Sequence, residues 1–319
     1  MSRNHIFGPV LSRRLGLSLG IDLVPFKTCP YDCAYCECGQ TTSKTVTRQD
    51  FFPPEDVMAE LCKVLASRPH LDSITLAGSG EPTLARSLGT VIDFIKRNYP
   101  EYPVSVLTNG SLLTRPDVRE ELLPADRVVP TLTTASQQTF EQIHNPHPSL
   151  KIESIIDGIV QFRKMYQGAL WLEVFVIPGL NTTADELAGL KEAIDLINPD
   201  LVQLNTLDRP AAEGWVEAAS DTELERVSRA LERPDTEIAG QRHPVSPTAR
   251  IKTDSSDLIR ATLCRRPSTV EDLVRTTGLS GGEVAKILGA LERGGEVTSL
   301  RGTRGVFYAI VPEKTNGDS

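Results

Sequence analysis

Short apolar runs alternate with helix-like segments along most of this chain. Apolar runs typical of buried strands occupy residues 17–24, 73–77, 104–107, 127–132, 170–177 and 201–205. Apolar positions at helical spacing between these runs predict helices over residues 54–65, 84–98, 151–165 and 184–197. Because parallel neighbours need crossover helices, this series predicts an α/β fold with a parallel sheet. Right-handed crossovers would curl that sheet into a barrel or part of one.

The pattern changes after residue 250. Helices are predicted over residues 254–264, 268–276 and 283–292, followed by a hairpin of residues 297–300 and 306–310. Ser268 with Glu271, and Ser280 with Glu283, match the capping box that starts many helices. Three short helices and a hairpin resemble a small winged helix-turn-helix domain.

These patterns divide the chain into four segments. Residues 1–235 form the predicted α/β domain, and residues 236–250 are rich in proline and polar residues, as in a linker. Residues 251–312 form the second predicted domain, and residues 313–319 are predicted to be a disordered tail.

The composition is that of a protein with a substantial core, since 39% of the 319 residues are hydrophobic. No run reaches the ~18 apolar residues that indicate a membrane span. The first residues lack the apolar stretch of a signal peptide. We therefore expect a cytoplasmic protein with no membrane partner.

Charge is distributed unevenly between the two predicted domains. Residues 249–319 hold 11 Lys+Arg against 9 Asp+Glu; of the totals of 34 and 42, this leaves 23 against 33 in residues 1–248. An acidic body of this kind argues against broad nonspecific binding of nucleic acid by the larger domain.

Three cysteines carry the most informative chemistry of the chain. Cys29, Cys33 and Cys36 have the spacing C-x3-C-x2-C in one loop after the first predicted strand. Thiolates hold iron-sulfur clusters, usually four per cluster. Three thiolates on a 4Fe-4S cluster would leave one iron open to a ligand that is not protein. Cys38 lies beside this group, but we do not count it as a cluster ligand.

A zinc site is the alternative interpretation of this loop. Structural zinc is usually held by two short-spaced ligand pairs far apart in the sequence. The second pair is missing here, although Cys38 would supply a fourth sulfur locally, so the spacing favours an iron-sulfur cluster. Cys62 and Cys264 stand alone in helix-like surroundings, and we expect both to be buried.

Glycine and polar residues follow the next two predicted strands. The segment Gly78-Ser79-Gly80-Glu81-Pro82 comes after the second strand. Its small residues would let the backbone approach a ligand closely, and Glu81 could contact an ammonium group. Thr108 and Asn109 end the third strand, where a simple Asn-Gly turn is the alternative. Because chemistry in such folds gathers at the carboxyl ends of the strands, we expect these segments to share one edge.

The cysteine loop and the glycine segment together resemble the radical SAM superfamily. The resemblance implies a partial (β/α)6 barrel in which S-adenosyl-L-methionine binds the open iron of a 4Fe-4S cluster. Reductive cleavage there yields a 5′-deoxyadenosyl radical that abstracts hydrogen from a substrate. An electron donor such as flavodoxin or ferredoxin is implied as well. The residues that would contact the cofactor are the Gly78 to Pro82 segment, Tyr35, Thr108, Asn109, Thr134 and Asn205.

Residues 8–16, 36–41 and 205–210 resemble a subgroup related to the enzymes that build the wyosine base on tRNA. Unlike those enzymes, the chain has no second set of cysteines for another cluster, so its substrate is unidentified. Lys27 and Lys44 near the loop would suit an anionic substrate, but we expect them to be solvated surface lysines.

The second predicted domain leaves two functions open. A recognition helix enters the major groove through its first residues, and the helix that follows Ser280 carries few cations among Glu283 and Glu292. We therefore favour a docking domain for an RNA or peptide substrate over a sequence-specific DNA reader. The alternative for the whole chain is an iron-sulfur redox sensor that regulates DNA through this domain.

Overall fold

The structure is a computed structural model that describes residues 5–240, 255–302 and 304–311. The chain divides into two compact units. The first comprises Met1–Leu207 with Ala211–Val245, and the second comprises Asp208–Pro210 with Ser246–Ser319. Among the described residues, no helix combines the length and the apolar character needed to cross a membrane.

The first unit is built on an eight-stranded sheet in the order β1-β2-β5-β6-β7-β8-β9-β10. Neighbours from β2 to β10 run parallel, and only β1 is antiparallel to its neighbour β2. The strands are β1 (Ile6–Ser12), β2 (Gly16–Ile21), β5 (Ser73–Leu76), β6 (Val104–Thr108), β7 (Arg127–Pro130), β8 (Ala169–Phe175), β9 (Leu201–Asn205) and β10 (Thr236–Ile238).

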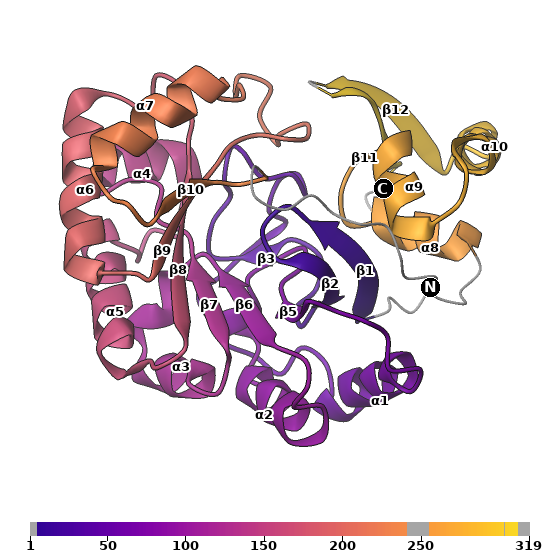
Figure 1. The fold of residues 1–319 in the computed structure, drawn as a ribbon, viewed down its shortest axis with the longest axis horizontal. Coiled ribbons are helices and arrows are strands. Elements are labelled where there is room, and N and C mark those ends of the chain that lie inside the picture. The colour runs from indigo at the N-terminus through magenta and orange to yellow at the C-terminus, as the bar shows by residue number, and fades with distance from the viewer. Residues whose placement is uncertain (1–4, 241–254, 303, 312–319) are drawn as a thin grey trace, which may run out of the picture. The chain divides into compact units, whose positions relative to one another are not determined.

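Helices cover the outer face of this curved sheet (Figure 1). The helices of this unit are α1 (Pro54–Leu65), α2 (Leu88–Asn98), α3 (Pro116–Leu122), α4 (Gln137–His144), α5 (Ile152–Met165), α6 (Ala184–Ile197) and α7 (Asp221–Leu231). Two short helices, η1 (Pro82–Leu84) and η2 (Ser111–Thr114), lie in the loops after β5 and β6. Each long helix buries an apolar stripe that repeats every three or four residues, as its period requires. In α2 this stripe is Leu88, Val91, Ile92 and Ile95.

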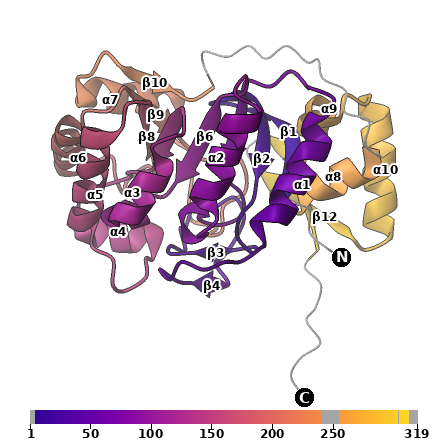
Figure 2. The ribbon, with the colours of Figure 1, turned by 90° about the horizontal axis from the view of Figure 1, so that it is seen from below.

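The register of the parallel strands aligns their carboxyl ends. Ile21 pairs with Leu76, and Leu76 pairs with Val106. The loops that follow β2, β5 and β6 therefore leave the sheet at the same edge, as expected from the sequence. Two short strands, β3 (Thr28–Cys29) and β4 (Ser43–Lys44), pair with each other apart from the large sheet (Figure 2).

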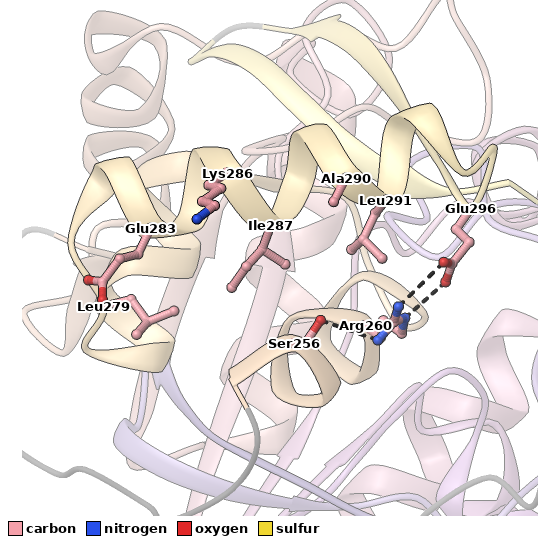
Figure 3. A pocket seen from close by; sticks show the side chains of 9 residues that line it. All are labelled: Ser256, Arg260, Leu279, Glu283, Lys286, Ile287, Ala290, Leu291 and Glu296. Atoms are coloured by element: carbon pink, nitrogen blue, oxygen red, sulfur yellow. Dashed lines mark hydrogen bonds and ion pairs between the residues drawn. The ribbon is translucent and has the colours of Figure 1, made fainter.

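The second unit contains three helices and a three-stranded sheet in the order β11-β13-β12. Its elements are α8 (Ser255–Leu263), α9 (Val270–Thr277), α10 (Gly281–Arg293), β11 (Ser268–Thr269), β12 (Val297–Gly302) and β13 (Gly305–Ile310). Leu273, Val284 and Leu288 lie in its apolar core. A pocket of about 600 Å³ lies beside α10, lined in part by Leu279 and Ile287 (Figure 3).

Several predictions at the level of single elements were wrong. Residues 236–238 belong to β10 and not to a linker, because they pair with β9. The capping box of α9 uses Thr269 and Asp272, one residue later than predicted, whereas that of α10 uses Ser280 and Glu283 as predicted. The predicted linker residues 241–250 and the predicted tail 313–319 lie outside the described residues.

Other differences concern burial and elements that the apolar pattern did not reveal. Cys62 and Cys264 are exposed, although burial was expected for both. Strand β1 was not predicted, since Gly8 and Pro9 interrupt its apolar run. The helices α3, α4 and α7 were not predicted either, since they are short or carry few apolar residues. Helix α4 proves important because its last residue, His144, packs against the cysteine loop.

Candidate functional site

The cysteine loop is held by the carboxyl end of α4. The backbone N–H of Asp32 donates to the carbonyl of His144, and that of Ala34 donates to the carbonyl of Ile143, each at 2.9 Å. The Asp32 carboxylate in turn accepts the N–H of Thr41 at 2.7 Å. These bonds give the loop a defined path between β3 and β4.

The four cysteines of this loop, Cys29, Cys33, Cys36 and Cys38, are all free and half-buried. In the part of the chain that the structure describes, no group of three or more His, Cys, Asp or Glu residues surrounds a position for a single metal ion. A cubane does not require such a group, because each of its irons takes one thiolate.

Each cysteine of the C-x3-C-x2-C pattern has a nitrogen next to its sulfur. The Nζ of Lys27 lies 3.0 Å from the Sγ of Cys36. The Nδ1 of His144 lies 3.2 Å from the Sγ of Cys33, and the Nδ2 of Asn109 lies 3.5 Å from that of Cys29.

The pKa values of the thiols follow these surroundings. Burial and the nearby charge of Glu81 raise the pKa of Cys29 to about 12. Burial also raises the pKa of Cys33. The pKa of Cys36 is lowered, first by the hydrogen bond from the Cys38 thiol and then by the ammonium group of Lys27. Cys36 is therefore the thiol that deprotonates most readily.

Lys27 is not the solvated surface lysine that the sequence led us to expect. Its side chain is buried, with 3% of the residue exposed. Burial lowers the pKa of Lys27, but the charge and hydrogen bond of Cys36 outweigh this and raise it overall. Lys44 does lie at the surface, where its Nζ donates to the carbonyl of Asn145 at 2.7 Å.

His144 is a site residue that no sequence pattern indicated. It is 3% exposed, and its ring is packed among Tyr31, Tyr35 and Phe140 with centroids 5.1 to 5.6 Å away. Burial lowers the pKa of His144 to about 3, so the imidazole is neutral at physiological pH.

The glycines of the segment after β5 are required by close packing. A Cβ at Gly78 would lie 2.4 Å from the carboxylate of Asp22, and a Cβ at Gly80 would lie 2.2 Å from the carbonyl oxygen of Thr28. Asp22 in turn accepts the hydroxyl of Ser79 at 2.9 Å. The small residues thus let this turn press against β2 and the start of the cysteine loop.

Glu81 links this turn to the end of β6. Glu81 as a residue is 2% exposed, and burial raises the pKa of its carboxyl. Oε1 accepts hydrogen bonds from the hydroxyls of Thr83 and Thr108, each at 2.6 Å, and from the N–H of Thr83 at 3.2 Å. Among the described residues, Oε2 accepts the N–H of Asn109, at 2.7 Å. Pro82 follows as the first residue of η1.

Tyr35, which precedes Cys36 in the cysteine loop, contacts the end of β8. Its ring stacks on Phe175 at the end of β8, with centroids 4.0 Å apart and an interplanar angle of 13°. One face of the tyrosine is therefore already covered by protein.

The two remaining predicted residues, Thr134 and Asn205, lie in separate polar clusters. The Thr134 hydroxyl donates to the carboxylate of Glu186 on α6 at 2.5 Å. The Asn205 Nδ2 donates to Glu173 at 2.7 Å, and Glu173 is ion-paired with Arg14 at 2.6 Å. The structure thus joins Glu81, Thr108 and Asn109 with the cysteine loop but engages Thr134 and Asn205 elsewhere.

The parallel α/β sheet thus brings a loop with three thiols and a buried glutamate together, through Asn109, at the edge where its strands end. Residues 23–190 match the family described as the Radical SAM superfamily. The chain belongs to this superfamily. The superfamily implies S-adenosylmethionine, an iron-sulfur cluster and an electron donor.

Curated relatives extend along most of the chain. A protein named GTPase Obg from Brachyspira hyodysenteriae is 34% identical over 93% of this chain and 44% of its own length. UPF0026 protein MJ1312 from Methanocaldococcus jannaschii is 34% identical over 66% of this chain and 65% of its own length. A UPF0026 protein from Helicobacter pylori J99 is 34% identical over 84% and 86% of the two chains. The chain thus spans only 44% and 65% of the first two relatives.

The name of the first relative does not carry over to this chain. A phosphate-binding loop needs the pattern G-x4-G-K-[S/T], which this sequence lacks.

Solved structures resemble the chain in fold. A radical SAM methyltransferase from Sphaerobacter thermophilus superposes with a TM-score of 0.54 at 14% identity, over 69% of this chain and 65% of that one. A structure of TYW1 with a lysine–pyruvate adduct bound gives a TM-score of 0.50 at 18% identity, over 67% and 72% of the two chains. At these identities the likeness concerns the fold alone.

Proposed function

We propose that Cys29, Cys33 and Cys36 hold a 4Fe-4S cluster and that the turn after β5 binds S-adenosyl-L-methionine beside it. These residues would hold a group that, when bound, would supply one-electron reductive cleavage of the sulfonium and hydrogen abstraction from the substrate. The chain's own task is to position this cofactor and to exclude water around it.

The observation that carries this proposal is the direct connection between the two motifs. The N–H of Lys27 donates to the carbonyl of Ser79 at 2.9 Å, and the N–H of Glu81 donates to the carbonyl of Thr28 at 3.1 Å. The backbone of the cysteine loop is thereby joined to the backbone of the glycine turn. A ligand that contacts both a cluster iron and the glycine turn would therefore find these two regions already held together.

Glu81 is the residue suited to the amino group of the cofactor. A carboxylate has about four acceptor positions on its two oxygens. Oε1 of Glu81 accepts three protein hydrogen bonds and Oε2 accepts one, which leaves capacity at Oε2. An ammonium group there would make a charge-assisted hydrogen bond.

The adenosine part would lie against the loops at the ends of β7, β8 and β9. We assign Tyr35 to the adenine, although only the ring face away from Phe175 is available. Thr134 and Asn205 remain candidates for this wall. Thr134 is hydrogen-bonded to Glu186 and Asn205 to Glu173. Each side chain would therefore contact the cofactor from an orientation that its carboxylate partner holds.

We further propose that the first unit is a partial (β/α)6 barrel and that the second is a winged helix-turn-helix domain. The second assignment is supported by three helices and the β11-β13-β12 sheet. Its capped helix α10 presents few cations: Lys286 is the cation that α10 contributes to the pocket of Figure 3. We therefore propose that this domain docks an RNA or peptide substrate, in an enzyme of the cytoplasm related to the wyosine-base subgroup and served by flavodoxin or ferredoxin.

The test is cofactor cleavage by the full chain. Protein reconstituted with iron and sulfide without oxygen should release 5′-deoxyadenosine when given dithionite and S-adenosylmethionine. Cys29→Ala should abolish the release, whereas Cys62→Ser, at an exposed cysteine outside the loop, should leave it unchanged. No release by loaded protein, together with cluster-dependent binding to DNA, would favour the redox-sensor alternative.

A further inference from the structure

We propose that Lys27, His144 and Asn109 each donate a hydrogen bond to one of the three cysteine sulfurs that hold the cluster, and that together they raise its reduction potential. This inference rests on the proposed function, since it assumes that Cys29, Cys33 and Cys36 bind the cluster. The three donors come from three different segments: the loop after β2, the end of α4 and the loop after β6.

Lys27 is fixed in place by its backbone. Its φ is 55°, a left-handed conformation that non-glycine residues rarely adopt. The carbonyl of Lys27 accepts the N–H groups of Thr42 and Ser43, each at 3.1 Å, and its own N–H donates to Ser79. The strained residue is thus held on both sides, and its buried ammonium group ends at the sulfur of Cys36.

Hydrogen bonds also orient His144 and Asn109. A thiolate can only accept a hydrogen bond, so the Nδ1 of His144 carries the hydrogen when Cys33 is ionised. The carbonyl of His144 is bonded to the N–H of Asp32, which fixes this residue to the loop it faces. The Oδ1 of Asn109 accepts the N–H of Ser111 at 2.9 Å, and this directs its Nδ2 toward Cys29.

The sign of the effect follows from charge. Reduction adds one electron, so the reduced cluster and its thiolates carry one more negative charge than the oxidised form. Donors and a cation at the sulfurs stabilise the more negative form, and hydrogen bonds to sulfur are known to set cluster potentials. Because the site is buried, the charge of Lys27 acts with little screening. The donors should therefore make the cluster easier to reduce by a one-electron protein donor.

The experiment compares Lys27→Met with Lys44→Met in reconstituted full-length protein. Lys44 is the matched control, because it pairs with Cys29 in the β3–β4 register but points its ammonium group at Asn145. Iron and sulfide content is measured first, and the midpoint potential is then obtained by titration followed by electron paramagnetic resonance. We expect Lys27→Met to lower the equilibrium constant for reduction by about tenfold, a shift of ~59 mV for one electron. Lys27→Arg should retain most of the parent value.

A second variant makes the test independent of Lys27. His144→Phe removes the donor to Cys33 but keeps an aromatic ring among Tyr31, Tyr35 and Phe140. It should also shift the potential to a more negative value. Loaded variants with the parent potential would overturn the inference and leave the proposed function intact. Failure of the parent chain itself to bind a cluster would instead contradict the proposed function, and with it this inference.

Discussion

The backbone N–H of Asn109 donates to the carboxylate of Glu81 at 2.7 Å. This bond joins the loop after β6 to the turn after β5, and the side chain of the same asparagine faces the sulfur of Cys29. Asn109 therefore connects the glycine turn with the cysteine loop. We therefore expect a substitution in the glycine turn to affect the cysteine loop, and a substitution in the loop to affect the turn.

Replacing Glu81 should weaken both folding and cofactor binding. Glu81→Gln removes the charge from the hydrogen bonds that Thr83, Thr108 and Asn109 donate and puts an NH2 donor in place of one accepting oxygen; a hydrogen bond to a charged group is worth about 1.5–3 kcal/mol. We expect a lower free energy of unfolding in urea and a loss of S-adenosylmethionine binding by calorimetry. Glu192→Gln, at an exposed position of α6, serves as the control. Full retention of cofactor affinity by Glu81→Gln would contradict the assigned role.

The glycine turn should not tolerate a methyl group. Gly80→Ala places a Cβ 2.2 Å from the backbone oxygen of Thr28, and overpacking of this kind costs about 1–3 kcal/mol. Because the turn contacts the cysteine loop, cluster content should fall as well. Gly214→Ala, where a Cβ meets nothing within 4 Å, should change neither thermal stability nor iron content. Equal thermal stability and iron content in the two variants would show that the close contact between Gly80 and Thr28 is unimportant.

Removing Cys38 should leave the cluster in place. The spacing assigns the three ligands to Cys29, Cys33 and Cys36, and the neighbouring Cys38 thiol contributes by lowering the pKa of Cys36. We expect Cys38→Ala to retain its iron, sulfide and visible absorption after reconstitution, and Cys33→Ala to lose them. The reverse pattern would assign Cys38 as a ligand in place of Cys33.

The stability of the second unit should depend on pH through Asp272. Burial raises the pKa of this carboxyl, but the hydrogen bond from Arg304 and the charge of Arg209 outweigh it and hold the pKa well below its usual range. A lowered carboxyl pKa stabilises the fold above the unfolded value of about 3.9. That stabilisation is lost as the pH falls through the native value.

Asp272→Asn should therefore be less stable than the parent at pH 7, by about 1.5–3 kcal/mol, because it removes the nearer of two carboxylates paired with the buried Arg209, at 2.8 Å, and leaves Asp208 at 3.9 Å. The difference should narrow in thermal unfolding below about pH 4, where the Asp272 carboxyl of the unfolded parent begins to bind protons while that of the native state is still ionised. Glu271→Gln, which removes an exposed ion pair with Arg275 on the same helix, should cost only about 0.3–0.5 kcal/mol. A gap that stays constant down to the lowest pH tested would contradict the ion-pair explanation.

Much of the framework could be predicted from local patterns. Helix α6 and strand β9 have the predicted bounds, because their apolar positions have a clear period and are flanked by turn residues. The cysteine spacing and the glycine turn were also evident, since both motifs are contiguous in the sequence. Elements with few apolar residues, such as α7, were missed because the tertiary contacts that stabilise them have no local pattern.

The sequence alone determined the chemical groups: three thiols in one loop, a glutamate in a glycine turn, and parallel strands to present them. Only the tertiary structure decided the surroundings of the thiols. It buries Lys27 against Cys36 and brings His144, 111 residues away in sequence, to Cys33. Long-range packing of α4 and the loop after β2 produces these contacts, and the same packing sets the burial that controls each pKa. For this reason a lysine that appears solvated in the sequence is a buried cation in the folded protein.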